Sequence, residues 1–193
     1  AGALSWGDCG IFASDFDQGD AWGSQRFVPT NLEFKKSYFA FDDIIIALGS
    51  NIASSGTYSN DMITATNLFQ NLTSSLSGQL LHNGVVVERP SKLVLPANTN
   101  NWLLAPQGTG YFIPRNNDEL VVVHDFQRTP YETGSDFSSP ITNAVAAKAY
   151  INHGVKPSNK QHSFVVVPAA NADAMAQLAT QLDENGGSIY QLH

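Results

Sequence analysis

Cysteine, charge and long hydrophobic runs are all scarce in this 193-residue chain. The single cysteine, Cys9, excludes an internal disulfide and a zinc site built from several thiolates. Charged residues make up 14% of the chain, against about 25% in a typical protein. The formal net charge of −7 argues against nucleic-acid binding, which needs a basic face. No apolar run reaches the roughly 20 residues of a membrane-spanning helix.

The residues that remain are typical of an all-β domain. Short apolar runs, many alternating with polar residues, recur between turn-forming residues at the spacing of a β-sandwich. The Asn83-Gly84 pair between two such runs predicts a tight hairpin turn, because both positions of that turn need a positive φ. Residues 1–193 are therefore predicted to form a single antiparallel β-sandwich domain. The expected strands are 37–48, 79–82, 85–88, 92–95, 102–105, 111–113, 120–124, 144–151, 163–167 and 188–192.

One α-helix is expected near the C-terminal end. Asn171 is a suitable N-cap, and apolar residues at 175, 178, 179 and 182 repeat with helical spacing. Gly186-Gly187 is expected to end the helix. The stretches 53–60, 96–101 and 129–140 are predicted to be surface loops, and the last is long enough for a binding loop.

Four stretches resemble one enzyme family in the same order. Residues 36–43 (KSYFAFDD) followed by 44–52 (IIIALGSNI) resemble the β-domain of the polysaccharide lyases that cleave chondroitin, hyaluronan or xanthan, polysaccharide lyase family 8. Residues 64–70 (TATNLFQ), 102–112 (WLLAPQGTGYF) and 150–168, with its His-Gly-x-x-Pro motif, resemble the strands that follow in that family. The resemblance is greatest to the chondroitinase ABC and hyaluronate lyase type. It implies the galactose-mutarotase-like supersandwich fold.

The resemblance also implies what this chain lacks. Lyases of this family cleave by β-elimination, with Tyr, His and Arg on a large separate helical domain that has no counterpart here. Their sandwich domain adds a Glu near its start, whereas residues 3–10 hold no Glu and Asp8 is the nearest carboxylate. We therefore expect a domain that derives from a lyase, retains binding and has the catalytic helical domain as a partner.

Binding of an acidic polysaccharide calls for rings that stack on sugars and for Arg groups that pair with carboxylates or sulfates. Trp102 begins an apolar strand, which favours a core position, and Arg115 fits a solvated position equally well. The net charge of −7 predicts that binding to chondroitin sulfate, dermatan sulfate or hyaluronan is modest and salt-sensitive. The candidate carbohydrate-binding residues are Trp22, Arg26, Trp102, Arg115, Asn116, Asn117, Arg128 and Tyr131.

Histidine and acidic residues suggest two further roles. His153, in the family motif, is expected to make a structural hydrogen bond. His124-Asp125 ends a strand, and a catalytic dyad at that pair is a minor alternative. Asp15, Asp17 and Asp20 are candidate Ca²⁺ ligands because oxygen ligands closely spaced in a Gly-containing loop suit that ion. A solvated acidic loop is the alternative.

Together these observations predict a non-catalytic carbohydrate-binding domain, secreted or periplasmic in a bacterium, with no nucleic-acid or membrane partner. Two alternatives remain open. The domain contributes residues to the cleft of a glycosaminoglycan lyase, or it is a structural spacer that binds nothing.

Overall fold

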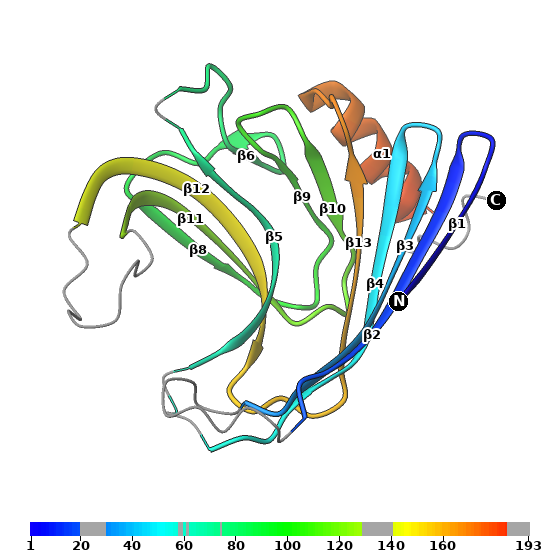
Figure 1. Cartoon of the computed structure of the whole chain (residues 1–193). Helices are drawn as coiled ribbons and strands as arrows, with labels where there is room; N and C mark the ends of the chain where they lie inside the picture. Colours follow the sequence, from blue (N-terminus) through cyan, green and yellow to red (C-terminus); the bar gives the residue numbers. More distant parts are fainter. Residues whose placement is uncertain (20–29, 58–59, 61, 74, 129–140, 185–193) are drawn as a thin grey trace.

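The computed structural model describes residues 1–19, 30–57, 60, 62–73, 75–128 and 141–184, without the side chains of 128 and 141–143. Two antiparallel sheets face each other, and one helix packs on the larger sheet (Figure 1). The predicted antiparallel β-sandwich with one C-terminal helix is confirmed. No helix in the described part of the chain is long and apolar enough to cross a membrane.

Sheet A has nine strands, and its order does not follow the sequence. It runs β1 (Gly2–Trp6), β2 (Cys9–Asp17), β3 (Leu32–Phe41), β4 (Ile44–Ser54), β13 (Lys160–Val167), β10 (Gly110–Ile113), β9 (Asn101–Leu104), β6 (Leu81–His82), β7 (Val85–Val86). Sheet B has four strands, in the order β5 (Thr64–Leu72), β12 (Ile141–Gly154), β11 (Glu119–Arg128), β8 (Ser91–Leu95). The helix α1 covers Ala172–Glu184.

The strongest local sequence signals are confirmed. Asn83 and Gly84 form the turn between β6 and β7 with φ of 49° and 84°. The Asn83 side chain also accepts a hydrogen bond from the Trp102 backbone N–H at 2.8 Å, which ties the turn to β9. Asn171 caps α1 by accepting from the Ala174 N–H at 2.9 Å. The predicted helix end at 186–187, the loop 129–140 and the strand 188–192 lie outside the described residues.

The N-terminal third differs from the prediction. The expected single strand 37–48 is wrong, because Asp42 adopts a φ of 46° and the chain turns back there from β3 to β4. The strands β1 and β2 were also not expected. They form a hairpin that extends sheet A beyond β3.

Sheet A has a core on each face. Successive residues of a strand point to opposite faces, so Ile46 of β4 packs under α1 while Ala47 packs between the sheets. The core between the sheets includes Phe69, Leu103, Tyr111, Leu120, Val122, Ile151 and Phe164. The core between sheet A and the helix includes Trp102, Phe112, Val165, Met175 and Leu182.

The two sheets differ in width, and this difference positions the candidate site. Sheet B covers the inner face of sheet A around β4, where Ala47 has no exposed surface. Further out, on β2, Phe12 is 42% and Phe16 is 43% exposed on that same inner face. The inner face of β1 to β3 is therefore open (Figure 1).

Candidate functional site

The open part of sheet A carries four aromatic rings in two cross-strand pairs. Phe12 of β2 lies opposite Tyr38 of β3, with ring centroids 6.2 Å apart. Phe16 lies opposite Phe34, with stacked rings at 4.8 Å. Residues two apart on a strand point to the same face, so all four side chains lie on the inner face. We call Phe12, Phe16, Phe34 and Tyr38 the aromatic face.

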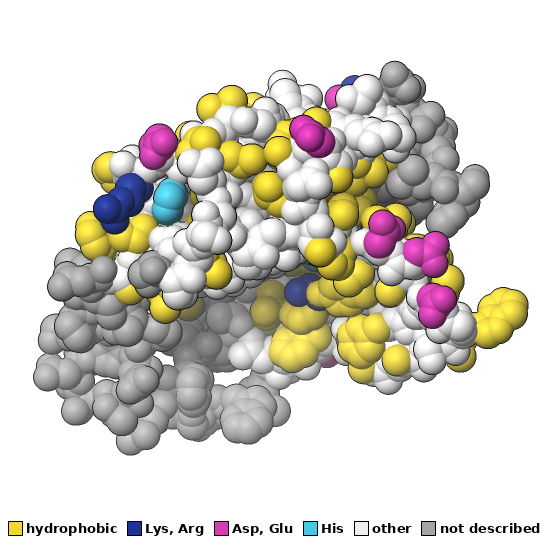
Figure 2. All heavy atoms as spheres, turned by 90° about the horizontal axis from the view of Figure 1, so that it is seen from above, with side chains coloured by type: hydrophobic (Ala, Val, Ile, Leu, Met, Phe, Trp, Pro, Cys, Tyr) yellow, Lys and Arg dark blue, Asp and Glu magenta, His cyan; other side chains and the backbone are white. Residues whose placement is uncertain are grey.

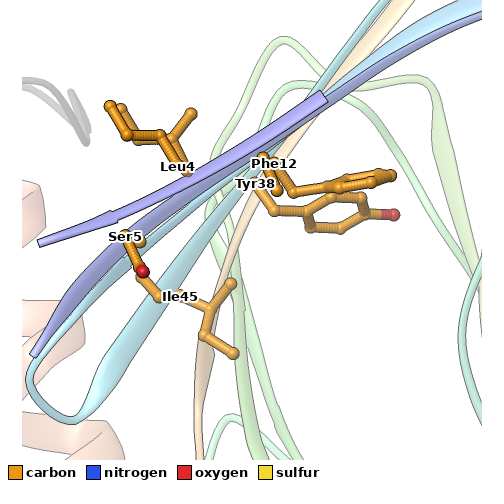
Figure 3. Close-up of a pocket in the computed structure, with 9 residues that line it drawn as sticks. Leu4, Ser5, Phe12, Tyr38 and Ile45 are labelled. Carbon is orange, nitrogen blue, oxygen red and sulfur yellow. The ribbon is translucent and has the colours of Figure 1, made fainter. Parts of the chain in front are cut away.

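A shallow hollow of about 470 Å³ lies at one end of the aromatic face. Phe12 and Tyr38 point side by side in the same direction, whereas Leu4 points away from them (Figure 3). Seen from above, one side of the molecule shows hydrophobic side chains gathered beside a Lys or Arg side chain (Figure 2). Residues that line this hollow are Ala3, Leu4, Ser5, Gly10, Ile11, Phe12, Tyr38, Ala40 and Ile45.

Next to the aromatic face, a buried hydrogen-bond chain joins the two sheets. Asp118 accepts from Nδ1 of His153 at 2.7 Å, and its other oxygen accepts from Lys160 at 2.6 Å. Nε2 of His153 lies 2.9 Å from the Thr66 hydroxyl, which lies 3.0 Å from Nδ1 of His162. Thr66 and His153 belong to sheet B, and Lys160 and His162 belong to sheet A. These hydrogen bonds therefore connect the two sheets at one end of the core.

The proton positions in this chain follow from the acceptors. The Asp118 carboxylate only accepts, so His153 donates from Nδ1, and with a neutral ring its Nε2 accepts from the Thr66 hydroxyl. The Thr66 oxygen then accepts from Nδ1–H of His162. Burial, with smaller contributions from the charges of Lys36 and His153, lowers the pKa of His162 to about 4. His162 is therefore neutral at pH 7.

The Asp118 carboxylate is held in its charged form. Burial alone raises its pKa, but the hydrogen bonds and charges of His153 and Lys160 outweigh burial and hold that pKa below its ordinary value. The order Asp118, His153, Thr66 has the connectivity of a catalytic triad. Thr66 is only 6% exposed and already bonds to His162, so its hydroxyl cannot reach a substrate. This series of hydrogen bonds therefore has a structural role, as expected for His153.

Comparison with known proteins identifies the family. The model of the polysaccharide lyase family 8 super-sandwich domain matches residues 1–179. The chain belongs to polysaccharide lyase family 8.

Curated family members support this membership. The chain is 30% identical over 175 residues to the chondroitin sulfate ABC endolyase of Proteus vulgaris, and the match covers 87% of this chain and 15% of that enzyme. It is 26% identical to the chondroitinase-AC of Pedobacter heparinus, with 86% and 23% covered. The chain thus spans less than a quarter of the length of these two family members.

Solved structures agree on the fold. A chondroitinase AC lyase superimposes with a TM-score of 0.67 at 23% identity, covering 94% of this chain and 24% of that chain. A Paenibacillus xanthan lyase gives a TM-score of 0.64 at 22% identity, covering 89% and 16%. The super-sandwich fold of family 8 is therefore the fold of this chain.

Two of the predicted carbohydrate-binding residues have structural roles in this family 8 domain. Trp102 is 7% exposed and packs in the core beneath α1, which is the alternative considered for it. Asn117 is 6% exposed, and its amide group donates to the Pro114 and Ser163 carbonyl oxygens at 2.7 and 2.9 Å. Its side-chain oxygen accepts from the Ser163 N–H at 2.9 Å. Both side chains are buried and contribute to the fold, and their role in carbohydrate binding stays a prediction.

Asn117→Ala is expected to lower the free energy of unfolding by about 2 kcal/mol, because it removes three hydrogen bonds and leaves buried backbone groups of β13 without partners. Urea unfolding at pH 7 measures this loss. Asn116→Gly is the control, since Asn116 is exposed and its φ of 77° suits glycine. Equal stability of the two variants would contradict the structural role of Asn117.

The other predicted binding residues are not brought to the aromatic face by the described structure. Arg115 and Asn116 are exposed after β10, which is separated from β3 by β4 and β13. Arg128 ends β11, and its side chain lies outside the described residues, as do Trp22, Arg26 and Tyr131.

The acidic residues proposed for calcium are not arranged as predicted. Asp15 and Asp17 belong to β2 and not to a loop, and Asp15 lies 3.7 Å from Lys35 across the strand pair. Asp20 lies outside the described residues. The described part of the chain contains no group of three His, Cys, Asp or Glu side chains suited to a metal ion.

The aromatic face was missed at the sequence level, although a signal was present. Phe12, Ser14 and Phe16 are spaced by two, and so are Phe34, Lys36 and Tyr38. Such spacing places the rings on one face of each strand. The acidic residues between Asp15 and Asp20 favoured a loop there and concealed the strand.

Proposed function

We propose that this family 8 domain binds an acidic polysaccharide of the glycosaminoglycan type on its aromatic face and does not cleave it alone. The observation that carries the proposal is the row of four rings on the inner face of sheet A, in which Phe12 and Phe16 are exposed and their partners Tyr38 and Phe34 are partly buried. In the parent protein the domain holds the sugar chain for a catalytic helical domain, outside the cell, where such polymers occur.

The physical basis is the match between flat rings and sugar faces. A pyranose presents C–H groups on one face, and aromatic side chains cover such a face with little loss of conformational entropy, since each has only two side-chain torsions. The rings lie near the edge of a wide sheet, on its second and third strands, and not in a narrow cavity. An extended polymer can therefore run along the strands and continue beyond them.

The family relationship supports the choice of polymer. The matching enzymes from Proteus vulgaris and Pedobacter heparinus are named for chondroitin sulfate or chondroitin. Cleavage by this domain alone is not expected, because His153 and His162 are buried and both are hydrogen-bonded to Thr66.

Phe12→Ala is expected to weaken binding of a chondroitin sulfate hexasaccharide about tenfold, because the truncated side chain no longer covers the sugar face. Leu4→Ala is the matched control: Leu4 is 71% exposed on the same hairpin but points to the other face (Figure 3). Isothermal titration at low salt measures both affinities.

Three outcomes are distinguished by assaying the end-mixture for unsaturated uronate ends. Saturable heat without new ends, lost in Phe12→Ala and kept in Leu4→Ala, supports the proposal. New unsaturated ends would replace it by a lyase activity of the domain itself. Absence of heat in the unmodified domain would leave a structural spacer.

A further inference from the structure

A lysine lies between the two ring pairs of the aromatic face. Ser14 of β2, Lys36 of β3, Gly49 of β4 and His162 of β13 are paired in register across four adjacent strands. Lys36 therefore shares the inner face with the aromatic rings. Its ammonium group lies 4.8 Å from the centroid of the Phe34 ring.

Gly49 of β4 is the neighbour of Lys36 on the side of the inter-sheet core. A side chain at position 49 would separate Lys36 from His162, but glycine leaves that space open, and the His162 ring fills it. Lys36 thus lies between Phe34 and Tyr38 along β3, next to the edge of the inter-sheet core, and it is half-buried. Burial removes part of the hydration of the ammonium group and so lowers its pKa.

This half-buried cation has no carboxylate partner among the described residues. The ion pairs there join Lys35 to Asp15, and Lys160 and His153 to Asp118. Lys35, the next residue, alternates to the opposite face and is exposed. A partly dehydrated charge without an opposite charge is costly, so an anion arriving on the aromatic face gains a favourable contact.

We propose that Lys36 is an anion subsite that binds a carboxylate or sulfate group of a saccharide stacked on the aromatic face. This inference rests on the proposed function and adds the residue that selects an acidic sugar over a neutral one. Ser14, the cross-strand neighbour of Lys36, offers a hydroxyl donor on the same face. Lysine acts as a point charge without the fixed fork of arginine, so carboxylate and sulfate are expected to bind about equally.

Lys36→Met tests the subsite, with Lys35→Met as the matched control one residue away. We titrate each protein at low salt with hexasaccharides of hyaluronan, of chondroitin 4-sulfate and of neutral chitin. The unmodified domain is expected to bind both acidic hexasaccharides about tenfold more tightly than the neutral one. Lys36→Met should remove this difference and leave neutral binding unchanged, and Lys35→Met should leave all three affinities unchanged.

Lys36→Arg separates charge from packing, because it keeps the positive charge and should keep the acidic preference. Retained preference in Lys36→Met would overturn the subsite while leaving saccharide binding intact. Absence of binding by all three hexasaccharides in the unmodified domain would overturn the proposed function and the subsite together. Should only the sulfated hexasaccharide show the lysine dependence, the carboxylate part of the proposal is wrong.

A direct measurement needs no variant. The Lys36 side chain, labelled with carbon-13, reports its own titration by NMR. Saturation with hyaluronan hexasaccharide is expected to raise the Lys36 pKa, because a nearby anion favours the charged ammonium. An unchanged titration under saturation would contradict contact between Lys36 and the ligand.

Discussion

Gly49→Ala is expected to lower the free energy of unfolding by about 4 kcal/mol. A Cβ atom at position 49 would lie 2.1 Å from Cε1 and 2.5 Å from Nδ1 of His162. The imidazole of His162 is a rigid ring that is hydrogen-bonded to the Thr66 hydroxyl, so it has to move as a whole. The move adds overpacking strain and breaks the hydrogen bond that connects β13 to sheet B.

Urea unfolding of the purified domain measures this effect, and two comparisons make it specific. Gly2→Ala is the control, because nothing lies within 4 Å of the added methyl group. In a His162→Ala background the same Gly49→Ala change should cost much less, since the ring that it meets is gone. A full cost in that background would show that the backbone at Gly49, and not His162, requires glycine.

Acidification is expected to remove about 3 kcal/mol of stability between pH 6.5 and pH 4. The pKa of His162 is about 4 in the folded domain and 6.5 in its ordinary state. Below pH 6.5 the unfolded chain takes up a proton that the folded chain accepts only near pH 4. The stabilisation is therefore complete above pH 6.5 and declines as the pH falls towards 4.

The surroundings of His162 explain why protonation is unfavourable. Desolvation is the main cause, the charge of Lys36 adds repulsion, and the His153 ring adds repulsion when it is protonated. No carboxylate contacts His162 directly among the described residues, because Asp118 bonds to His153 and Lys160. The pKa of Asp118 is lowered as well. Its contribution to folding stability is therefore complete when the pH is above the ordinary pKa of an aspartate, and it is lost as the pH falls below that pKa.

Unfolding free energies at half-unit steps from pH 8 to pH 4.5 test this expectation. His162→Gln keeps a hydrogen-bonding side chain and removes the ionisable ring, so its curve should be flatter over this range. A wild-type curve without decline would show that His162 is not the group that limits acid stability.

The elements predicted from sequence are those that depend on local chemistry. The Asn83-Gly84 turn and the Asn171 cap each need only a few neighbouring residues, and both are confirmed. The Asp42 turn was missed because Asp-Asp is a weaker turn signal than Asn-Gly. The packing of the strands into two facing sheets is not determined by local signals, and it was predicted from the resemblance to family 8.

The candidate site depended on information that no single segment contains. Trp102 and Phe12 are both aromatic residues in strands, yet one is buried under α1 and the other is 42% exposed. The extent to which sheet B and the helix cover sheet A decides which of the two side chains is exposed. That extent is set by strand order, and it has no signature in the residues themselves.

The position of β13 within sheet A determines the order in which the domain can assemble. β13 lies between β4 and β10, although more than 100 residues separate it from β4 in sequence. Until residues 160–167 have left the ribosome, the apolar strand β4 has an unpaired edge, and such edges promote association between chains. The N-terminal strands must therefore wait for nearly the whole chain. We expect synthesis of this domain to depend on protection of that edge, with folding completed after translation.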